Sequence, residues 1–142
     1  MRCAVLAAIA SFVLAAPATA LAPGPPRALR VLTGGHSVLA SLVHVCITHD
    51  RSVDCQARPV HFKGTLRVTP GARLALKLDR TAGSVSVGLR RGDRAIGRMT
   101  RAIGGGNRFH WIAPRSLRGA NRLNVIARYA QSSSRFEAAI SR

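Results

Sequence analysis

Short stretches of alternating apolar and polar residues run along the chain from residue 28 to its end. In RLNVIARYA, residues 122–130, Leu123, Val125 and Ala127 share one face, while arginine and asparagine occupy the other. A period of two is typical of strands with one buried face, and Gly, Pro, Asn, Asp or Ser ends each stretch. No long stretch repeats with a period of about 3.6 residues, as an amphipathic helix would. The pattern predicts an all-β fold of eight or nine short strands.

Two stretches predict hairpins in more detail. In residues 64–79, GTLRVTPGARLALKLD, a Pro70-Gly71 turn separates a run around Leu66 from a run around Leu76. Proline and glycine at such positions favour a tight turn. We therefore expect these two runs to pair as a hairpin.

The second predicted hairpin spans residues 83–99, GSVSVGLRRGDRAIGRM. Its turn is Gly92-Asp93, with valines and a leucine facing inward before the turn and a weaker strand around Ile96 after it. Gly88 and Gly97 lie inside these strands, where glycine often marks a bulge or a close approach of the backbone. The glycine-rich run IGGGNR, residues 103–108, lacks the lysine and hydroxyl of a phosphate-binding loop and is interpreted as a hairpin loop.

Many short strands in series favour two packed antiparallel sheets, and a single β-sandwich is the common solution at this length. Residues 37–48 fit this less cleanly, because apolar side chains fall on both faces of the predicted strand. A central strand covered on both sides would explain them. Phe109 and Trp111 share one strand face, and we expect Trp111 in the core because large aromatic side chains dominate burial.

The end of the chain resembles the last hairpin of immunoglobulin-like sandwiches. Gly119-Ala120-Asn121 precedes an alternating strand that ends at Tyr129, and a polar turn leads to a closing strand through Phe136 and Ile140. The resemblance covers roughly residues 64–141 and implies an immunoglobulin-like fold, without a specific activity. Two features depart from a true immunoglobulin domain, because the cysteines lie too close in sequence for an inter-sheet bridge and Trp111 does not lie between them.

The first residues have the anatomy of a secretory signal peptide. Arg2 precedes an apolar run that is too short to span a bilayer comfortably, and Ala18-Thr19-Ala20 matches a cleavage site. We expect residues 1–20 to be removed, residues 21–27 to form a proline-rich leader, and residues 28–142 to form the β-sandwich domain. The mature chain would have no transmembrane span and would be secreted or held at the cell envelope.

The stretch HVCITHDRSVDC, residues 44–55, concentrates groups with redox and metal chemistry. Removal of the signal peptide leaves Cys46 and Cys55 as a pair, and paired thiols in an oxidising compartment usually form a disulfide. The alternative is a copper or zinc site built from histidine and cysteine ligands, although the spacing matches no strong zinc motif. Its candidate ligands are His44, Cys46, His49, Cys55 and His61. We expect the disulfide, and no cofactor.

Charge is the second prominent feature of the sequence. The chain has 22 basic and five acidic side chains, and all the basic residues except Lys63 and Lys77 are arginine. Arginine favours planar, bidentate contacts with phosphate and carboxylate groups, so anionic envelope polymers or lipid head groups are the expected partners. A GC-rich genome could produce the same composition without selection for binding. The candidate polyanion-binding residues crowd one turn and are Arg90, Arg91, Arg94 and Arg98.

Other functional classes find little support in the sequence. The acidic residues are scattered, and the chain has no Gly-X-Ser-X-Gly, His-Glu-X-X-His or phosphate-loop motif, so we do not expect an enzyme. Export and an aromatic content of 4% argue against nucleic-acid binding, which uses aromatic stacking platforms on single strands. The sequence therefore favours an exported, non-enzymatic binding or structural module, with a small copper- or zinc-binding protein as the alternative.

Overall fold

The computed structural model describes residues 24–142, and this part of the chain consists of strands and turns without a helix. Its first part contains β1 (Leu29–Thr33), β2 (His36–Leu39), β3 (Ser41–His49), β4 (Ser52–Ala57), β5 (Thr65–Arg67) and β6 (Arg73–Leu78). Its second part contains β7 (Ser84–Arg91), β8 (Arg94–Arg101), β9 (Ile103–Gly105), β10 (Arg108–Ile112), β11 (Arg122–Tyr129) and β12 (Ser132–Ser141). The all-β prediction is confirmed, but the expected eight or nine strands are too few. The proposed signal peptide, residues 1–20, lies outside the described residues.

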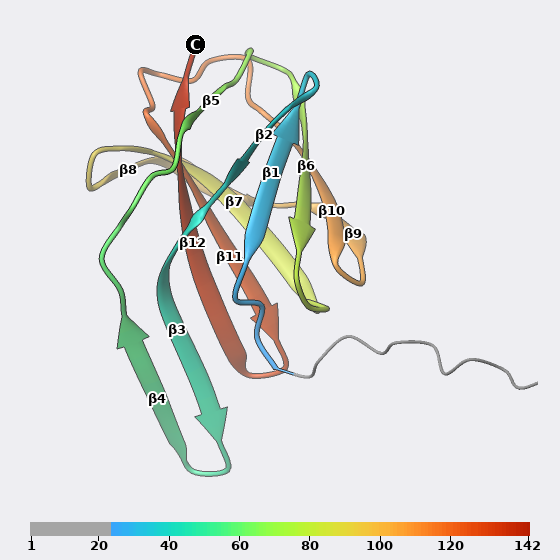
Figure 1. Cartoon of the computed structure of the whole chain (residues 1–142), viewed down its shortest axis with the longest axis vertical. Helices are drawn as coiled ribbons and strands as arrows, with labels where there is room; N and C mark the ends of the chain where they lie inside the picture. The colour runs from blue at the N-terminus through green and yellow to red at the C-terminus, as the bar shows by residue number, and fades with distance from the viewer. Residues whose placement is uncertain (1–23) are drawn as a thin grey trace, which may run out of the picture.

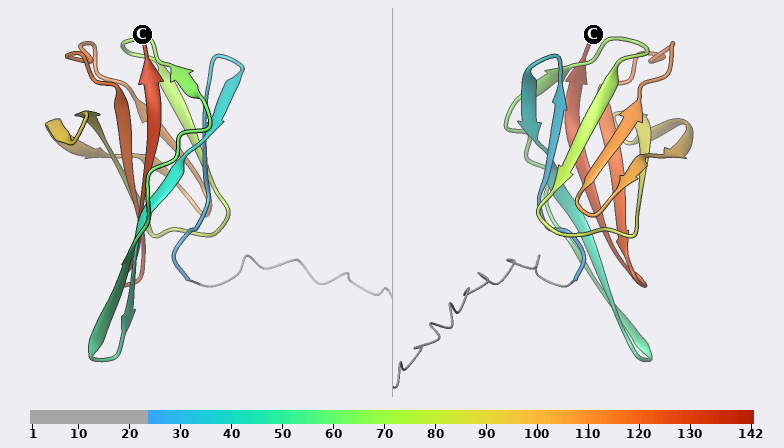
Figure 2. Two further views of the ribbon diagram at one scale, coloured as in Figure 1. Left: turned by 60° about the vertical axis from the view of Figure 1, so that its left-hand side comes forward. Right: turned by 90° about the vertical axis from the view of Figure 1, so that its right-hand side faces the viewer.

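The strands form two sheets that pack face to face as a β-sandwich (Figure 1). The five-stranded sheet has the order β2-β1-β6-β10-β9, and the seven-stranded sheet has the order β4-β3-β12-β11-β7-β8, with β5 beside β12. Both sheets contribute alternate side chains to one core, as a sandwich requires. The largest fully buried members of this core are Phe136, Leu29, Leu66, Leu74, Leu76, Leu78, Leu117 and Leu123. The right-hand view of Figure 2 looks onto the five-stranded sheet.

The chain between β5 and β6 crosses from one sheet to the other. β5 pairs in parallel with the end of β12, where Leu66 lies opposite Ile140, whereas β6 lies between β1 and β10. The expected hairpin over residues 64–79 is therefore wrong. Pro70 and Gly71 do form a turn, and Gly71 has a φ of 78°, but this turn connects two layers. Alternation predicts the strands but not their partners, because Leu66 and Leu76 face the same core from opposite sides.

The predicted strand over residues 37–48 divides at Ala40. Its first half is β2 on the edge of the five-stranded sheet, and its second half is β3 between β12 and β4 of the seven-stranded sheet. The backbone N–H of Ala40 donates to the carbonyl of Leu29 at 2.9 Å, which holds the crossing point. The idea of one strand covered on both faces is wrong. Val38 and Leu42 instead pack against the core from different sheets, and a register shift in the β3–β12 ladder after Leu42 breaks the single alternation.

The three other predicted hairpins and the predicted burial of Trp111 are confirmed. β7 and β8 form a hairpin around Gly92-Asp93, with Val85, Val87 and Leu89 buried. Its register shifts at Gly88, where an added Cβ atom would lie 2.9 Å from Cγ of Met99 and would displace that side chain. β9 and β10 form the hairpin at the glycine-rich run, and Phe109 and Trp111 are buried on alternate positions of β10. β11 and β12 form the closing hairpin.

The β3–β4 hairpin projects from one end of the sandwich (Figure 1, lower part; Figure 2). All six residues of β4 are exposed, and within the described chain β4 pairs with β3 alone. Inter-strand hydrogen bonds and one covalent bond therefore hold this strand, with little help from the core. The covalent bond is the predicted disulfide.

Candidate functional site

The four candidate arginines of the β7–β8 turn divide into two pairs. The guanidinium of Arg90 donates to the carbonyl of Gly92, and its Nε lies 3.8 Å from Oε1 of Glu137. Arg91 donates through Nε to the carbonyl of Gly119 at 3.4 Å and through Nη2 to the carbonyl of Arg118. These two side chains have structural partners within the sandwich, so they contribute less to an external contact than the sequence alone indicates.

Arg94 and Arg98 form the other pair. Both side chains are exposed, and neither has a hydrogen bond or an ion pair within residues 24–142. Arg94 lines a shallow cleft of about 310 Å³ together with Arg91 and Arg118. Exposed guanidiniums that share one cleft can bind one anionic group through several N–H donors. The turn therefore keeps two of the four candidate residues available to a ligand.

Arg98 does not line that cleft but borders a second one, of about 390 Å³, at the open side of the sandwich between β8 and β10. Trp111 lies against this opening, and its Nε1 donates to Oγ1 of Thr100 at 2.7 Å, which ties the five-stranded sheet to β8 of the seven-stranded sheet. Leu89 and Ile96 supply further apolar lining. An apolar cleft with a few polar groups at its rim is the usual form of a small-molecule site.

Arg118 lines both clefts and is a candidate that the sequence analysis missed. It lies in the segment between β10 and β11, and its φ of 49° places a non-glycine residue in the left-handed region. Its carbonyl accepts from Arg91, which holds this backbone conformation. Left-handed non-glycine residues are uncommon, and Ala130 in the β11–β12 turn is the other one among the described residues, so the place of Arg118 in both clefts makes it a candidate.

A buried carboxylate organises the outer face of the seven-stranded sheet. The side chain of Glu137 is 3% exposed, and its Oε2 accepts from Nη1 of Arg122 at 3.3 Å. The same Nη1 lies 3.4 Å from the exposed carboxylate of Asp93, and the ring of Phe62 lies 5.3 Å from Cζ of Arg122. Two of the five acidic residues are therefore engaged by arginines near the β7–β8 turn, which leaves no free carboxylate there.

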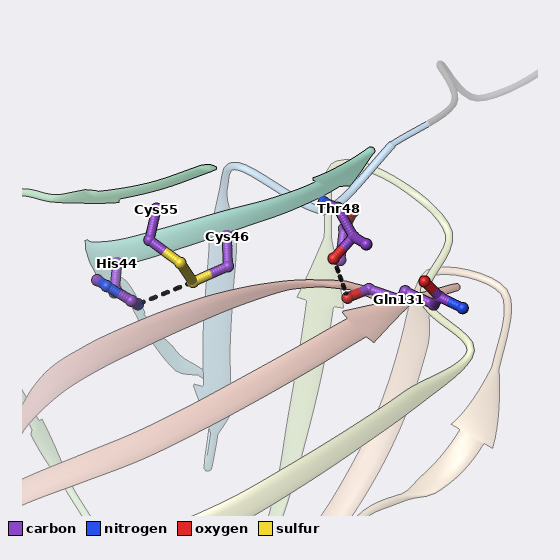
Figure 3. The surroundings of a disulfide bond; sticks show 6 residues. His44, Cys46, Thr48, Cys55 and Gln131 are labelled. Carbon is purple, nitrogen blue, oxygen red and sulfur yellow. Dashed lines mark hydrogen bonds between the residues drawn. A yellow bond between two sulfur atoms is a disulfide. The ribbon is translucent and has the colours of Figure 1, made fainter. Parts of the chain in front are cut away.

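The predicted disulfide is present between β3 and β4 (Figure 3). Cys46 and Cys55 lie directly opposite each other in the ladder, with their Cα atoms 4.1 Å apart. Nδ1 of His44, two residues before Cys46 on the same face of β3, lies 3.6 Å from its Sγ. Thr48 continues this face and donates to the carbonyl of Gln131 at 2.8 Å, which fixes β3 against the turn before β12.

Three of the five candidate metal ligands come together on the hairpin. The ligand atoms of His44, Cys46 and Cys55 all lie within 4.8 Å of one another. His49 ends β3 on the opposite face, and His61 lies in the exposed segment after β4, where its backbone N–H donates to Oγ of Ser41. With the disulfide closed, both sulfur atoms are bonded to each other, so thiolate ligands exist only after reduction.

Comparison with protein-family models, with curated proteins and with solved structures found no match to this chain. Within residues 24–142 there is no helix of the length and apolarity needed to cross a membrane.

Proposed function

We propose that this protein is an exported, non-enzymatic binding module that acts at the cell envelope or outside the cell. Its ligands are anionic polymers or lipid head groups, and its arginine-rich surface binds them. The proposal of export depends on the signal-peptide pattern of residues 1–20. The proposal of an immunoglobulin-like sandwich depends on the β11–β12 hairpin and its flanking turns, and such sandwiches serve many binding roles.

The distribution of charge is the observation that carries this proposal. Asp79 accepts from the backbone N–H groups of Arg27 and Ala28, and Asp93 and Glu137 pair with arginines. Many exposed cationic side chains consequently have no hydrogen bond or ion pair in the described part of the chain. They include those of Arg51, Arg58, Lys63, Arg67, Arg73, Lys77, Arg94, Arg98, Arg101, Arg108, Arg115, Arg118 and Arg128. Such a surface attracts polyanions over distances of about one Debye length.

A binding role also agrees with the placement of the acidic side chains. Catalysis by acid and base groups needs a carboxylate or histidine that can reach a substrate and change its protonation state. Glu137 is buried against Arg90 and Arg122, whereas Asp50 and Asp54 lie on the projecting hairpin. The clefts near Trp111 are lined mainly by arginine, hydroxyl and apolar side chains, with His110 at the smaller cleft, and none of the described carboxylates lines either of them, which suits retention of an anion.

Retention on an anionic resin across a salt gradient tests the proposal. Replacement of Arg94 and Arg98 by serine should lower the salt concentration for elution more than replacement of Arg67 and Arg128, whose side chains are also exposed and without partners in residues 24–142. Arg90 and Arg91 are left unchanged because their contacts stabilise the fold. Equal losses in the two variants would show that total charge, and not the β7–β8 turn, governs binding. Failure of the wild-type protein to bind at physiological salt would refute the proposal.

A small copper- or zinc-binding protein is the second candidate function, and the cluster of His44, Cys46 and Cys55 favours it. Thiolate and imidazole ligands suit Zn²⁺ and Cu⁺. A dithiol reductant should open the disulfide, and a stoichiometric metal complex that weakens on replacement of His44 by alanine would support this function. Full alkylation of both reduced thiols in the presence of the metal would contradict it.

A further inference from the structure

Two isoleucines project from the outer face of the five-stranded sheet. Ile103 on β9 is 79% exposed and Ile112 on β10 is 66% exposed. Ile103 lies opposite His110, which is two residues before Ile112, so both isoleucines lie on one face in diagonal positions. Diagonal neighbours on adjacent strands are about 7 to 8 Å apart, close enough to form one apolar surface. Isolated exposed apolar residues are ordinary, but an adjacent pair of this exposure needs a reason.

Arginines surround this isoleucine pair. A cleft of about 330 Å³ is lined by both isoleucines and Trp111 together with Arg73 and Arg101. Arg73 lies directly opposite Ile112 in the ladder between β6 and β10. The apolar pair therefore lies within reach of guanidiniums whose aliphatic stems can lie along it while their charged ends face outward.

The same sheet face carries a row of three cations. Lys77 lies opposite Arg30 on one neighbouring strand and opposite Arg108 on the other, and all three side chains are exposed. Like charges placed directly opposite each other in a sheet oppose folding, so the charge of the row does not stabilise the free protein, although Nη1 of Arg30 donates to Oγ of Ser37 at 3.2 Å. None of the five strands of this sheet contains an acidic residue. The face is thus cationic on its three central strands, β1, β6 and β10, and apolar at the β9–β10 edge.

We propose that the outer face of the five-stranded sheet docks on a bilayer that contains anionic lipids. The cation row and the arginines around the cleft contact the head groups, and Ile103 and Ile112 enter the interfacial region. This inference rests on the proposed binding of anions and selects a lipid surface as the ligand. A lipid surface offers negative charge and an apolar layer together, whereas an anionic polymer offers charge alone. A second copy of the chain that bound to this face would bring two cationic surfaces together, so charge repulsion opposes a dimer through this face.

Vesicle flotation tests the role of the isoleucines. The wild-type protein should float with vesicles of equal parts phosphatidylglycerol and phosphatidylcholine, and should not float with phosphatidylcholine alone. Replacement of Ile103 and Ile112 by serine should weaken the partition coefficient by about tenfold, because two partly inserted side chains are lost. Val53 on the projecting hairpin is 62% exposed, so Val53→Ser is the matched control and should bind like the wild-type protein.

A second measurement gives a gain of signal and does not depend on lost binding. The variant Ile103→Trp should show fluorescence quenching by phosphatidylglycerol vesicles with brominated acyl chains, and Val53→Trp should not. Trp111 contributes the same background to both variants. Quenching only in Ile103→Trp supports docking through the β9–β10 edge, and equal quenching in both variants refutes it.

The outcomes separate this inference from the proposed function. If the wild-type protein does not bind an anionic resin at physiological salt, the proposed function itself is wrong, and if it binds the resin but not anionic vesicles, only the docking on lipid is wrong. If it binds both, and the serine variant partitions like the wild-type protein, then binding is electrostatic and the lipid-docking face is wrong. If the wild-type protein forms dimers that the serine variant does not form, the isoleucines serve contact between copies, and docking on lipid is refuted.

Discussion

Arg122 provides an internal comparison between a buried and an exposed carboxylate. Its Nη1 lies 3.3 Å from Oε2 of Glu137 and 3.4 Å from Oδ1 of Asp93, while the two carboxylate side chains are 3% and 97% exposed. The distance is nearly the same and the guanidinium is shared, so the two pairs differ in the burial of the carboxylate and in the second contact of Glu137 with Arg90. Neutral replacement of each carboxylate by its amide should therefore measure the effect of these two differences.

We expect Glu137→Gln to lower the free energy of unfolding by about 2 to 3 kcal/mol, because Arg90 loses its countercharge and Arg122 keeps only the exposed carboxylate of Asp93. The loss of one partner from a fully buried ion pair costs about 3 to 5 kcal/mol. The side chains of Arg90 and Arg122 remain 16% and 26% exposed, so water offsets part of this cost. Asp93→Asn should leave the stability nearly unchanged, since exposed ion pairs contribute little.

Thermal unfolding followed by circular dichroism provides the assay. For a domain of this size a loss of 1 kcal/mol lowers Tm by about 4 °C, so Glu137→Gln should lower Tm by about 8 to 12 °C. Any effect of Asp93→Asn should disappear in high salt, whereas that of Glu137→Gln should persist. Equal shifts in Tm for the two variants, or a stable Glu137→Gln protein, would contradict the assignment of Glu137 as the buried partner of both arginines.

Two further predictions concern the hairpins. Replacement of Cys46 and Cys55 by serine should destabilise the β3–β4 hairpin by up to about 2.7 kcal/mol, the loop-closure value for a loop of about ten residues, and hydrogen exchange should show the loss mainly in β4. Unchanged protection of β4 would mean that the ladder alone holds this strand. A Cβ atom at Gly104 would lie 2.3 Å from the carbonyl oxygen of Arg108, whereas a Cβ atom at Gly105 would have no neighbour within 4 Å. Gly104→Ala should therefore lower Tm clearly more than Gly105→Ala, and similar Tm values for both variants would disprove the close approach.

The sequence predicts strands well wherever one face of the strand is buried and the other is exposed to solvent. The core face of β11 shows this, because Leu123, Val125 and Ala127 are buried in the order that the alternation predicts, whereas the burial of Asn124 on its outer face was not predicted. Local chemistry also predicts the β7–β8 turn and the pairing of Cys46 with Cys55, since both depend on residues close in sequence. These features require no knowledge of how distant segments meet.

The assignment of strands to sheets could not be predicted in the same way. Leu66 and Leu76 both face the core, and an alternating pattern is the same whether two strands are neighbours in one sheet or lie in opposite sheets. The break at Ala40 is a similar case. A chain that passes from one sheet to the other keeps its apolar residues, and only the phase of the apolar–polar alternation changes. Pairing is decided by packing over the whole sandwich, which a local pattern does not encode.

The candidate site also divides into features that local sequence predicts and features that depend on strand pairing. Arginine density identified the β7–β8 turn, but Arg90 and Arg91 point to partners that come from elsewhere in the chain, Glu137 and the segment around Gly119. The cation row and the isoleucine pair were missed, because each forms across strands whose pairing the sequence pattern does not reveal. Cross-strand register, and not composition, creates these surfaces.

The cation row can decide between selection and genomic composition as the origin of the charge. Arg30, Lys77 and Arg108 repel one another in the free protein, so their replacement by glutamine should raise Tm at low ionic strength, and this gain should fade as salt screens the repulsion. A control variant with the same net charge replaces Arg67, Arg115 and Arg128 by glutamine. If genomic composition alone placed the cation row, the row variant should be more stable than the wild-type protein and should bind anionic vesicles as well as the control variant does. If the row is retained for binding, the row variant should gain stability and lose more binding than the control variant. A site kept at a cost to stability is the signature expected of a functional surface.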